Sequence, residues 1–163
     1  MKKQGLQPII GNNPRILILG SLPGDESLRR QEYYGNPRNM FWDVMSGILG
    51  EKAPAVYSEK IEYLKRHEIA LWDVLYSAER EGSLDSNIRN EDFNDIAGLI
   101  ADNPSIEAIV TNGGKAEKSL IKYLRRNPAL LSKRIHNCTS TSPMSICSGW
   151  NLEKLIGQWS EIL

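Results

Sequence analysis

The sequence predicts an α/β fold, a three-layer α/β/α sandwich around a central, mostly parallel four-stranded sheet. Three observations predict it: four apolar runs of strand length recur, they barely alternate with polar residues, and patterns of helical periodicity separate them. Continuous apolar runs are typical of strands buried on both faces, and strand–helix–strand alternation favours parallel strands with right-handed crossovers. The length of 163 residues, without a repeat or linker, indicates one domain over residues 1–163.

The predicted strands are the apolar runs themselves, and the last of them is the weakest. They are Ile16–Leu19, Ile69–Leu75, Ile106–Val110 and Arg134–Thr139. In a sheet of this kind ligands bind beyond the carboxyl ends of the strands. Four segments far apart in the sequence are therefore expected at one edge: the loop after Gly20, the loop after Leu75, Thr111–Gly114 and Thr139–Trp150.

Five helices are expected between and after the strands, each from an apolar stripe behind a residue able to begin a helix. They begin at Pro37, Ser58, Asn90, Gly113-Gly114 and Asn151. The first is the clearest, because Asn36 can cap it, apolar residues follow at helical spacing, and Gly50 ends it. The segment Tyr76–Asn90 is long and polar for a strand-to-helix connection, which makes it a candidate functional loop.

Charge and cysteine content exclude several classes of protein. The 20 basic and 20 acidic residues balance, so any contact with DNA has to be a local patch rather than a basic coat. The spacing of Cys138 and Cys147 fits no zinc or iron–sulfur motif, and His67 lies far from His136, so neither a metal site nor a cofactor is expected. No apolar run is long enough to span a membrane and no signal pattern is seen, which predicts a cytoplasmic protein.

The charged residues near the predicted loops, among them Asp73, Arg80 and Asp85, are expected to be mostly exposed to solvent. No Ser-His-Asp or Cys-His pairing, P-loop or dinucleotide fingerprint occurs. Chemistry therefore has to come from other side chains.

Two asparagines are candidates. Asn39, as the third residue of the predicted helix, can orient a water and hold an oxygen lone pair toward a developing cation, although spacing alone favours a residue that bonds the helix start. Asn112 ends a predicted buried strand, and its planar amide can match the adjacent C=O and N–H of uracil or hypoxanthine. The alternative for Asn112 is a turn residue that tolerates an unusual backbone angle.

The loops contribute an aromatic pair and a hydroxyl-rich segment. Tyr33 or Tyr34 offers a face for stacking on a base, and at least one of the two is expected to be an ordinary core or surface tyrosine. In residues 140–145, hydroxyls and backbone N–H groups can hold phosphates and Met144 can act as an apolar wedge between bases.

Four motifs then occur in order over nearly the whole chain: GSLPG (residues 20–24), YYGNPRNMFW (33–42), a strand ending in Asn112-Gly113, and TSTSPMS (139–145). This set resembles the uracil-DNA glycosylase superfamily, and most of all the branch known for excision of hypoxanthine from deoxyinosine. GSLPG and NPRNMFW are the specific motifs, and TSPMS adds support.

The resemblance implies roles for single residues. Asn39 matches the asparagine of the NPxNxFW motif, which in this branch positions the attacking water. Tyr34 matches the aromatic residue that stacks on the flipped base, and Asn112 the residue that reads the base edge. Backbone N–H groups around Gly20 and Ser21 would stabilise charge on the departing base.

The same resemblance places the DNA-inserting loop at Ser142, Pro143, Met144 and Ser145. The chain departs from relatives at two places. Leu22 stands where the mismatch-specific branch carries a water-positioning asparagine, and Ser140 stands where relatives with strong uracil activity carry a histidine. The iron–sulfur branches need four cysteines, whereas this chain has two.

The expected function is a monofunctional DNA glycosylase of base excision repair that acts on hypoxanthine in double-stranded DNA and leaves an abasic site. A cytoplasmic, nucleoid-associated location follows, without an obligate protein partner or a membrane. The alternatives are a mismatch-specific uracil or thymine glycosylase, a non-catalytic protein of the same fold that binds damaged bases, and a small nucleotide-binding domain that uses the same sheet edge for phosphate.

Overall fold

The computed structural model of the chain describes residues 2–163. Its central sheet has the strand order β3-β2-β6-β7, and every neighbouring pair is parallel. The strands are β2 (Ile16–Gly20), β3 (Ile69–Asp73), β6 (Ala108–Asn112) and β7 (Arg134–Cys138). The apolar runs of the sequence therefore supply this sheet, although β6 begins and ends two residues later than the predicted strand Ile106–Val110. The strands β2 and β6, which lie inside the sheet, are buried at every position.

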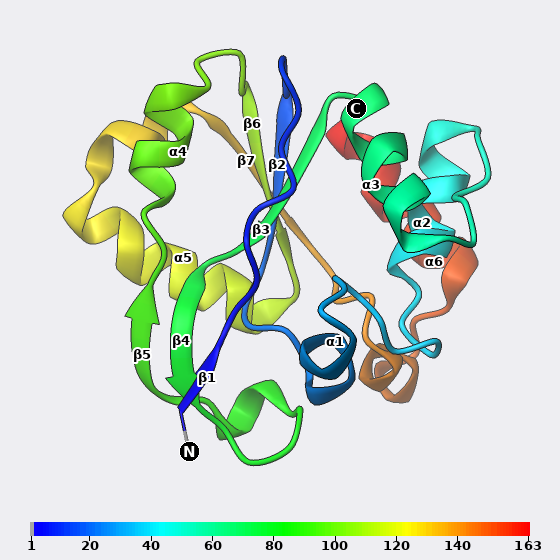
Figure 1. Ribbon diagram of the computed structural model, residues 1–163, viewed down its shortest axis with the longest axis horizontal. Coiled ribbons are helices and arrows are strands. Elements are labelled where there is room, and N and C mark those ends of the chain that lie inside the picture. The colour runs from blue at the N-terminus through cyan, green and yellow to red at the C-terminus, as the bar shows by residue number, and fades with distance from the viewer. Residues whose placement is uncertain (1) are drawn as a thin grey trace.

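Helices cover both faces of the sheet, which confirms the three-layer prediction (Figure 1). One face carries α4 (Ile96–Asp102) and α5 (Gly114–Arg126). The other carries α2 (Phe41–Leu49), α3 (Tyr57–Arg66) and α6 (Leu152–Trp159). Short helices connect the rest: α1 (Asp25–Arg30), η1 (Asp85–Asn87), η2 (Pro128–Ser132), η3 (Pro143–Ser148) and η4 (Ser160–Ile162).

Each face of the sheet has its own apolar core. Ile18, Leu71 and Val110 lie side by side in neighbouring strands and pack with Phe41 and Trp159 on the face of α2, α3 and α6. The residues between them along the strands belong to the second core, on the face of α4 and α5. Successive residues of each strand therefore face opposite sides of the sheet, and this alternation also decides which residues at the strand ends face α2.

A second sheet was not predicted. It is antiparallel, with the order β1-β4-β5, and consists of β1 (Lys2–Gln4), β4 (Leu75–Glu79) and β5 (Arg89–Phe93). The predicted strand Ile69–Leu75 thus divides after Asp73, because the next residues pair in another sheet. The predicted loop Tyr76–Asn90 is longer than the observed one, because it includes most of β4 and the first two residues of β5. Only residues 80–88, which include η1, connect the two strands of this hairpin.

The prediction of a helix beginning at Asn90 is wrong. Asn90 lies inside β5 with a φ of 52°, and α4 begins only at Ile96. Asp95 is the residue that caps this helix, since its carboxylate accepts a hydrogen bond from the backbone N–H of Gly98 at 3.0 Å. Pairing with β4 therefore overrides the local helical pattern of residues 90–93.

The start of α2 also differs from the prediction. Asn36 caps a turn rather than the helix, because its Oδ1 accepts from the N–H of Arg38 at 2.9 Å. Asn39 precedes the helix, and its Oδ1 accepts from the N–H of Phe41, the first helical residue. The N–H of Met40 donates to the carbonyl of Thr141 at 2.9 Å, so a contact distant in sequence holds this turn.

The other helices begin at or within one residue of the predicted positions. Asn151 caps α6 by accepting from the N–H of Lys154 at 2.9 Å. Within residues 2–163, no helix is both long and apolar enough to cross a membrane.

Candidate active site

A cavity of about 550 Å³ lies at the carboxyl ends of the parallel strands. This is the edge at which parallel α/β sheets bind their ligands. The segments expected at this edge contribute to its lining: residues 20–24, residues 83–86, residues 112, 114 and 115, and residues 140–144. Tyr34, Asn39 and Asp73 complete the part of the lining that matters for chemistry. The two carboxamides of the prediction, at 39 and 112, therefore open into one cavity.

The strand ends at Gly20, Asp73 and Asn112 form one side of the cavity, which we call its floor. Gly20 is the last residue of the central strand β2, opposite Asp73 of β3, and Asn112 ends β6 on its other side. A Cβ at Gly20 would lie 2.5 Å from Oδ1 of Asp73 and 3.1 Å from the hydroxyl oxygen of Tyr34. Glycine is therefore needed here because any side chain would displace the groups beside it.

Thr141 joins the two carboxamides in a hydrogen-bond network. The amide nitrogen of Asn112 donates to Oγ1 of Thr141 at 3.1 Å, and this hydroxyl donates to Oδ1 of Asn39 at 2.7 Å. The backbone N–H of Thr141 donates to Oδ1 of Asn112 at 3.0 Å. Thr141 is completely buried, so the network fixes the orientation of both amides without solvent.

The network decides which atoms remain for a ligand. Oδ1 of Asn39 already accepts from Phe41 and Thr141, so the group left for a ligand is its amide N–H rather than the oxygen lone pair expected from the sequence. The amide nitrogen of Asn112 uses both protons, on Tyr34 and Thr141. Asn112 keeps one acceptor lone pair on Oδ1.

Tyr34, not Tyr33, is the tyrosine placed for a ligand. The ring of Tyr33 is 3% exposed and its hydroxyl donates to the carbonyl of Gln7, which makes it a core residue. Tyr34 is half-buried, and Phe41 stacks on one face of its ring with the centroids 4.1 Å apart. One ring face therefore remains, and burial raises the pKa of the Tyr34 hydroxyl so that it stays neutral.

Asp73 is the charged side chain of the floor. It is 4% exposed, and its Oδ2 has no hydrogen-bond partner. Burial and, next, the nearby carboxylate of Asp85 raise the pKa of Asp73 to about 7, against a smaller opposite effect of Arg80. Near neutral pH this carboxyl is therefore divided between its two protonation states.

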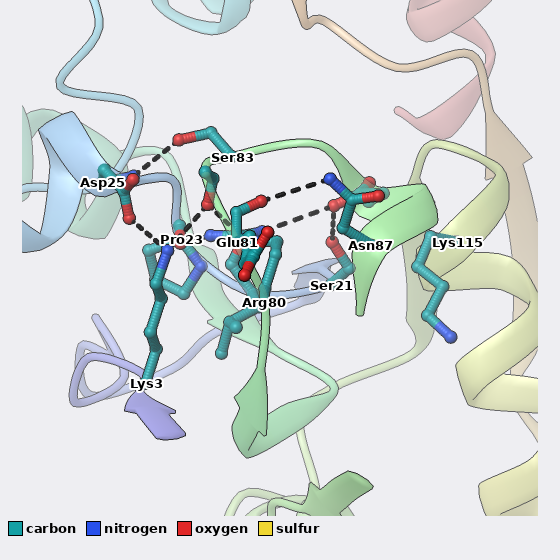
Figure 2. Close-up of polar contacts among 12 residues, drawn as sticks. Lys3, Ser21, Pro23, Asp25, Arg80, Glu81, Ser83, Asn87 and Lys115 are labelled. Atoms are coloured by element: carbon teal, nitrogen blue, oxygen red, sulfur yellow. Dashed lines mark hydrogen bonds and ion pairs between the residues drawn. The ribbon is translucent and has the colours of Figure 1, made fainter. Parts of the chain in front are cut away.

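Arg80 holds the hairpin onto the first loop of the cavity. Its guanidinium, whose side chain has no exposure, donates to the carbonyls of Leu22 and Pro23 and lies 3.6 Å from the carboxylate of Asp85 (Figure 2). Ser21 donates to the same carboxylate at 2.8 Å. The predicted functional loop therefore acts as a wall that clamps the GSLPG segment.

A second set of contacts joins this hairpin to α1 and β1. Lys3 bonds both Asp25 at 2.6 Å and the carbonyl of Gly82 at 2.7 Å, and the N–H of Asp25 donates to the hydroxyl of Ser83 at 2.9 Å (Figure 2). These contacts of β1 and α1 therefore help to hold the β4–β5 hairpin in place.

The hydroxyl-rich loop projects beside the cavity. Met144 is 56% exposed and Ile146 is 57% exposed, both on the short helix η3. Ser142 caps this helix by accepting from the N–H of Met144 at 3.3 Å, while Ser145 is buried and donates to the carbonyl of Ser142. Met144 and Ile146 are therefore the exposed apolar side chains of this loop, Pro143 is half-buried, and Ser142 and Ser145 hold the shape of the loop.

No group of three or more His, Cys, Asp or Glu side chains that could hold a metal ion occurs among residues 2–163. Cys138 is buried and Cys147 is exposed, and both are free thiols. The polar groups around the cavity are amides, hydroxyls, carboxyls and one lysine.

Comparisons with known proteins show the family to which this chain belongs. The family model described as the uracil DNA glycosylase superfamily matches residues 8–159. The chain belongs to the uracil DNA glycosylase superfamily. This superfamily consists of glycosylases, so the chain is a DNA glycosylase and its substrate is DNA.

Two curated members of the superfamily are similar over 117 residues. Proteins from Methanosarcina barkeri and Methanosarcina acetivorans, both named hypoxanthine DNA glycosylase, are 44% and 46% identical, and the match covers 71% of this chain and 74% of each relative. A solution NMR structure from Methanosarcina acetivorans, assigned as a candidate uracil DNA glycosylase, has a TM-score of 0.84 and 37% identity, with coverage of 99% and 96%.

The predicted parallel sheet located the cavity at its strand ends, but three residues that shape the cavity were not recognised as doing so. Asp73 and Arg80 were expected to be solvent-exposed and are buried, whereas Asp85 is exposed as expected. Thr141 was expected only as one of the loop residues whose hydroxyls can hold phosphates, whereas its hydroxyl is buried and joins the two amides. One signal was available for Asp73, since it is the charged residue inside the predicted strand Ile69–Leu75, directly after four apolar residues and close to the carboxyl end.

Proposed function

We propose that this DNA glycosylase is monofunctional and removes hypoxanthine from deoxyinosine in double-stranded DNA, as part of base excision repair in the cytoplasm at the nucleoid. The observation that carries the proposal is the identity of 44–46% with two relatives named hypoxanthine DNA glycosylase. The cavity supports it, because about 550 Å³ is within the range of small-molecule sites and suits a planar base.

The base has to leave the duplex before it can reach the cavity. Extrusion costs a few kcal/mol and is easiest for a poorly paired base, which suits inosine opposite T. Met144 supports this step, because it is an exposed apolar side chain in the lining of the cavity and side chains of this kind insert between base pairs. Hydrogen bonds of Ser142 and Ser145 hold the shape of that loop, and we propose that these two residues and Pro143 contact the DNA beside Met144.

Once extruded, the base would bind between the aromatic ring and the ends of the strands. We propose that it stacks on the face of Tyr34 that Phe41 leaves free. The remaining lone pair of Asn112 Oδ1 suits the N1–H of hypoxanthine, while backbone N–H groups around Gly20 and Ser21 stabilise charge on the departing ring.

Cleavage of the glycosidic bond leaves an oxocarbenium-like sugar that needs a well-placed water more than a strong base. The unpartnered amide N–H of Asn39 would hold the oxygen of that water, and Phe41 and Thr141 keep the amide in position. The only lysine in the cavity lining among residues 2–163, Lys115, is paired with Glu91, so an amine attack on the sugar is not expected and an abasic site is the product.

A panel of duplexes tests the proposal. Each contains one inosine, uracil, xanthine or thymine, and alkaline strand scission after incubation reports abasic sites. We expect inosine to give the fastest single-turnover cleavage, with no scission before alkali. Faster cleavage of uracil or of thymine opposite G would support the mismatch-specific alternative, which the 37% identity with a candidate uracil DNA glycosylase favours. Tight binding of all duplexes without abasic sites would identify a non-catalytic binder.

A further inference from the structure

Asp73 differs from every other polar side chain at the floor of the cavity. The amides of Asn39 and Asn112 are anchored by internal hydrogen bonds, whereas Oδ2 of Asp73 is buried without a partner. A buried polar atom normally has a hydrogen-bond partner, and leaving it without one costs about 1–3 kcal/mol. An unmet carboxyl oxygen of this kind at a ligand cavity indicates that the ligand supplies the partner.

The surroundings of Asp73 favour its neutral form. Its carboxyl is buried beside the last residue of β2, and the hydroxyl of Tyr34 lies near the same spot over Gly20. Burial is the main cause of its raised pKa, followed by the carboxylate of Asp85. Arg80 is the one cation facing it among the described residues, and the Arg80 guanidinium is engaged by the carbonyls of Leu22 and Pro23.

We propose that Asp73 is the general acid of the reaction and donates its proton to the O6/N7 edge of the extruded hypoxanthine as the glycosidic bond breaks. The inference rests on the proposed function, because it requires a purine in the cavity. Hypoxanthine presents the acceptor pair O6 and N7 that guanine also presents. Asp73 and Asn112 flank Gly20 from neighbouring strands, so they can meet different edges of one ring.

The step balances without a further reactant. The electron pair of the C1′–N9 bond moves onto the purine, the proton of the Asp73 carboxyl goes to the ring, and hypoxanthine leaves as a neutral molecule. Water held by Asn39 adds to C1′ and releases one proton, which restores the protonated carboxyl of Asp73. The net reaction consumes one water and yields hypoxanthine and an abasic site.

The sign of the pH dependence tests the assignment. If Asp73 acts as an acid, the single-turnover rate constant on an inosine duplex is constant at low pH and falls as the pH rises through about 7, by about tenfold per pH unit. An ionised Asp73 that only accepted a hydrogen bond from the base would give a rate constant that rises over the same range. That rise, or a flat profile, would overturn the inference.

Asp73→Asn is the matched variant, because it keeps the shape and a hydrogen-bond donor but cannot transfer a proton. General acids contribute typically 10²–10⁴-fold, so we expect the rate constant to fall by about 10²-fold or more and to lose its decline at high pH. Asp85→Asn removes the second cause of the raised pKa and is expected to move the decline to lower pH. A parental rate and profile for Asp73→Asn would overturn the proposal.

Two controls separate the possible failures. Asp43→Asn changes an exposed carboxylate on α2 and is expected to leave the profile unchanged. Thermal unfolding of Asp73→Asn shows whether this variant folds. If it does not fold, the pH dependence of the wild-type rate constant still tests the inference, because that measurement needs no variant. If the wild-type protein releases no hypoxanthine, the proposed function fails and the inference with it, whereas release with an unaffected Asp73→Asn variant rejects the inference alone.

Discussion

The two sides of the cavity are built in different ways. On one side, Asn39, Thr141 and Asn112 form a network in which nearly every hydrogen-bonding group already has a partner inside the protein. On the other side, Asp73 keeps an oxygen without a partner, and the neighbouring Arg80 holds backbone carbonyls of a loop. On the amide side the groups left for a ligand are the amide N–H of Asn39 and one lone pair of Asn112, both on side chains that the protein already anchors. On the acid side a buried oxygen has no partner at all.

This difference indicates a division of labour. A network anchored by internal hydrogen bonds fixes its remaining free groups in space without reorganisation, which is what positioning a water requires. The protonation state of a buried carboxyl whose oxygen lacks a hydrogen-bond partner instead depends on pH and on the bound ligand. The following variants test whether the two sides do act separately.

Asn39→Ala should have the largest effect. Loss of the amide that positions the water lowers the single-turnover rate constant by about 10²-fold or more, or on the order of 3 kcal/mol, while DNA affinity changes little. Rapid-quench kinetics and a binding titration with an inosine duplex measure the two quantities. Asn103→Ala, at the end of α4, is the control. Cleavage at the parental rate would remove Asn39 from the reaction.

Arg80→Met tests whether the wall is a rigid element. The carbonyls of Leu22 and Pro23 lose their buried donor, so we expect the free energy of unfolding to fall by about 2 kcal/mol. Proteolysis within residues 80–86 should become faster, and urea unfolding gives the stability. Arg125→Met, on the exposed surface of α5, should be neutral. Unchanged stability of Arg80→Met would show that the clamp is dispensable.

Thr141→Val separates positioning from folding on the amide side. Valine keeps the volume but removes the hydroxyl that joins the two amides, and we expect the rate constant to fall about tenfold, equivalent to about 1.4 kcal/mol. Thr141→Ser keeps the hydroxyl and should retain most of the activity. Equal rates for the Val and Ser variants would mean that the bridge does not matter for the reaction.

Besides its effect on the rate constant, Asp73→Asn should have a small effect on the free energy of unfolding, and this effect should depend on pH. Because the folded protein raises the pKa of Asp73 to about 7 from an ordinary 3.8, the folded state binds more protons than the unfolded state between these values. The contribution of Asp73 to the free energy of unfolding is therefore fully present at low pH, and it is lost as the pH rises toward 7. Thermal unfolding at several pH values should therefore show the variant gaining on the wild type as pH increases, and parallel curves would contradict the raised pKa.

The parallel sheet and the helices on its faces were predictable from the sequence because apolar runs and helical stripes are local signals. The second sheet was not, since β5 consists of the polar residues RNEDF and becomes a strand only through pairing with β4. The pattern at Asn90 favoured a helix locally, and a contact distant in sequence decided otherwise.

Site residues follow the same rule. Asn39, Tyr34 and Asn112 could be located from motifs and strand ends, and all three line the cavity. Their free atoms could not be predicted, because Thr141, from a loop about 100 residues away from Asn39, takes the lone pair that the sequence assigned to the reaction. The burial of Asp73 and Arg80 likewise depends on how the β4–β5 hairpin covers the first loop.

The most direct test of the account is identification of the base released from a duplex that carries a single inosine opposite T. After incubation with the wild-type protein, mass spectrometry of the small-molecule fraction should find free hypoxanthine in an amount equal to the abasic sites formed, with the DNA strand intact until alkali is added. Unmodified inosine in the duplex after prolonged incubation with excess protein would contradict the account.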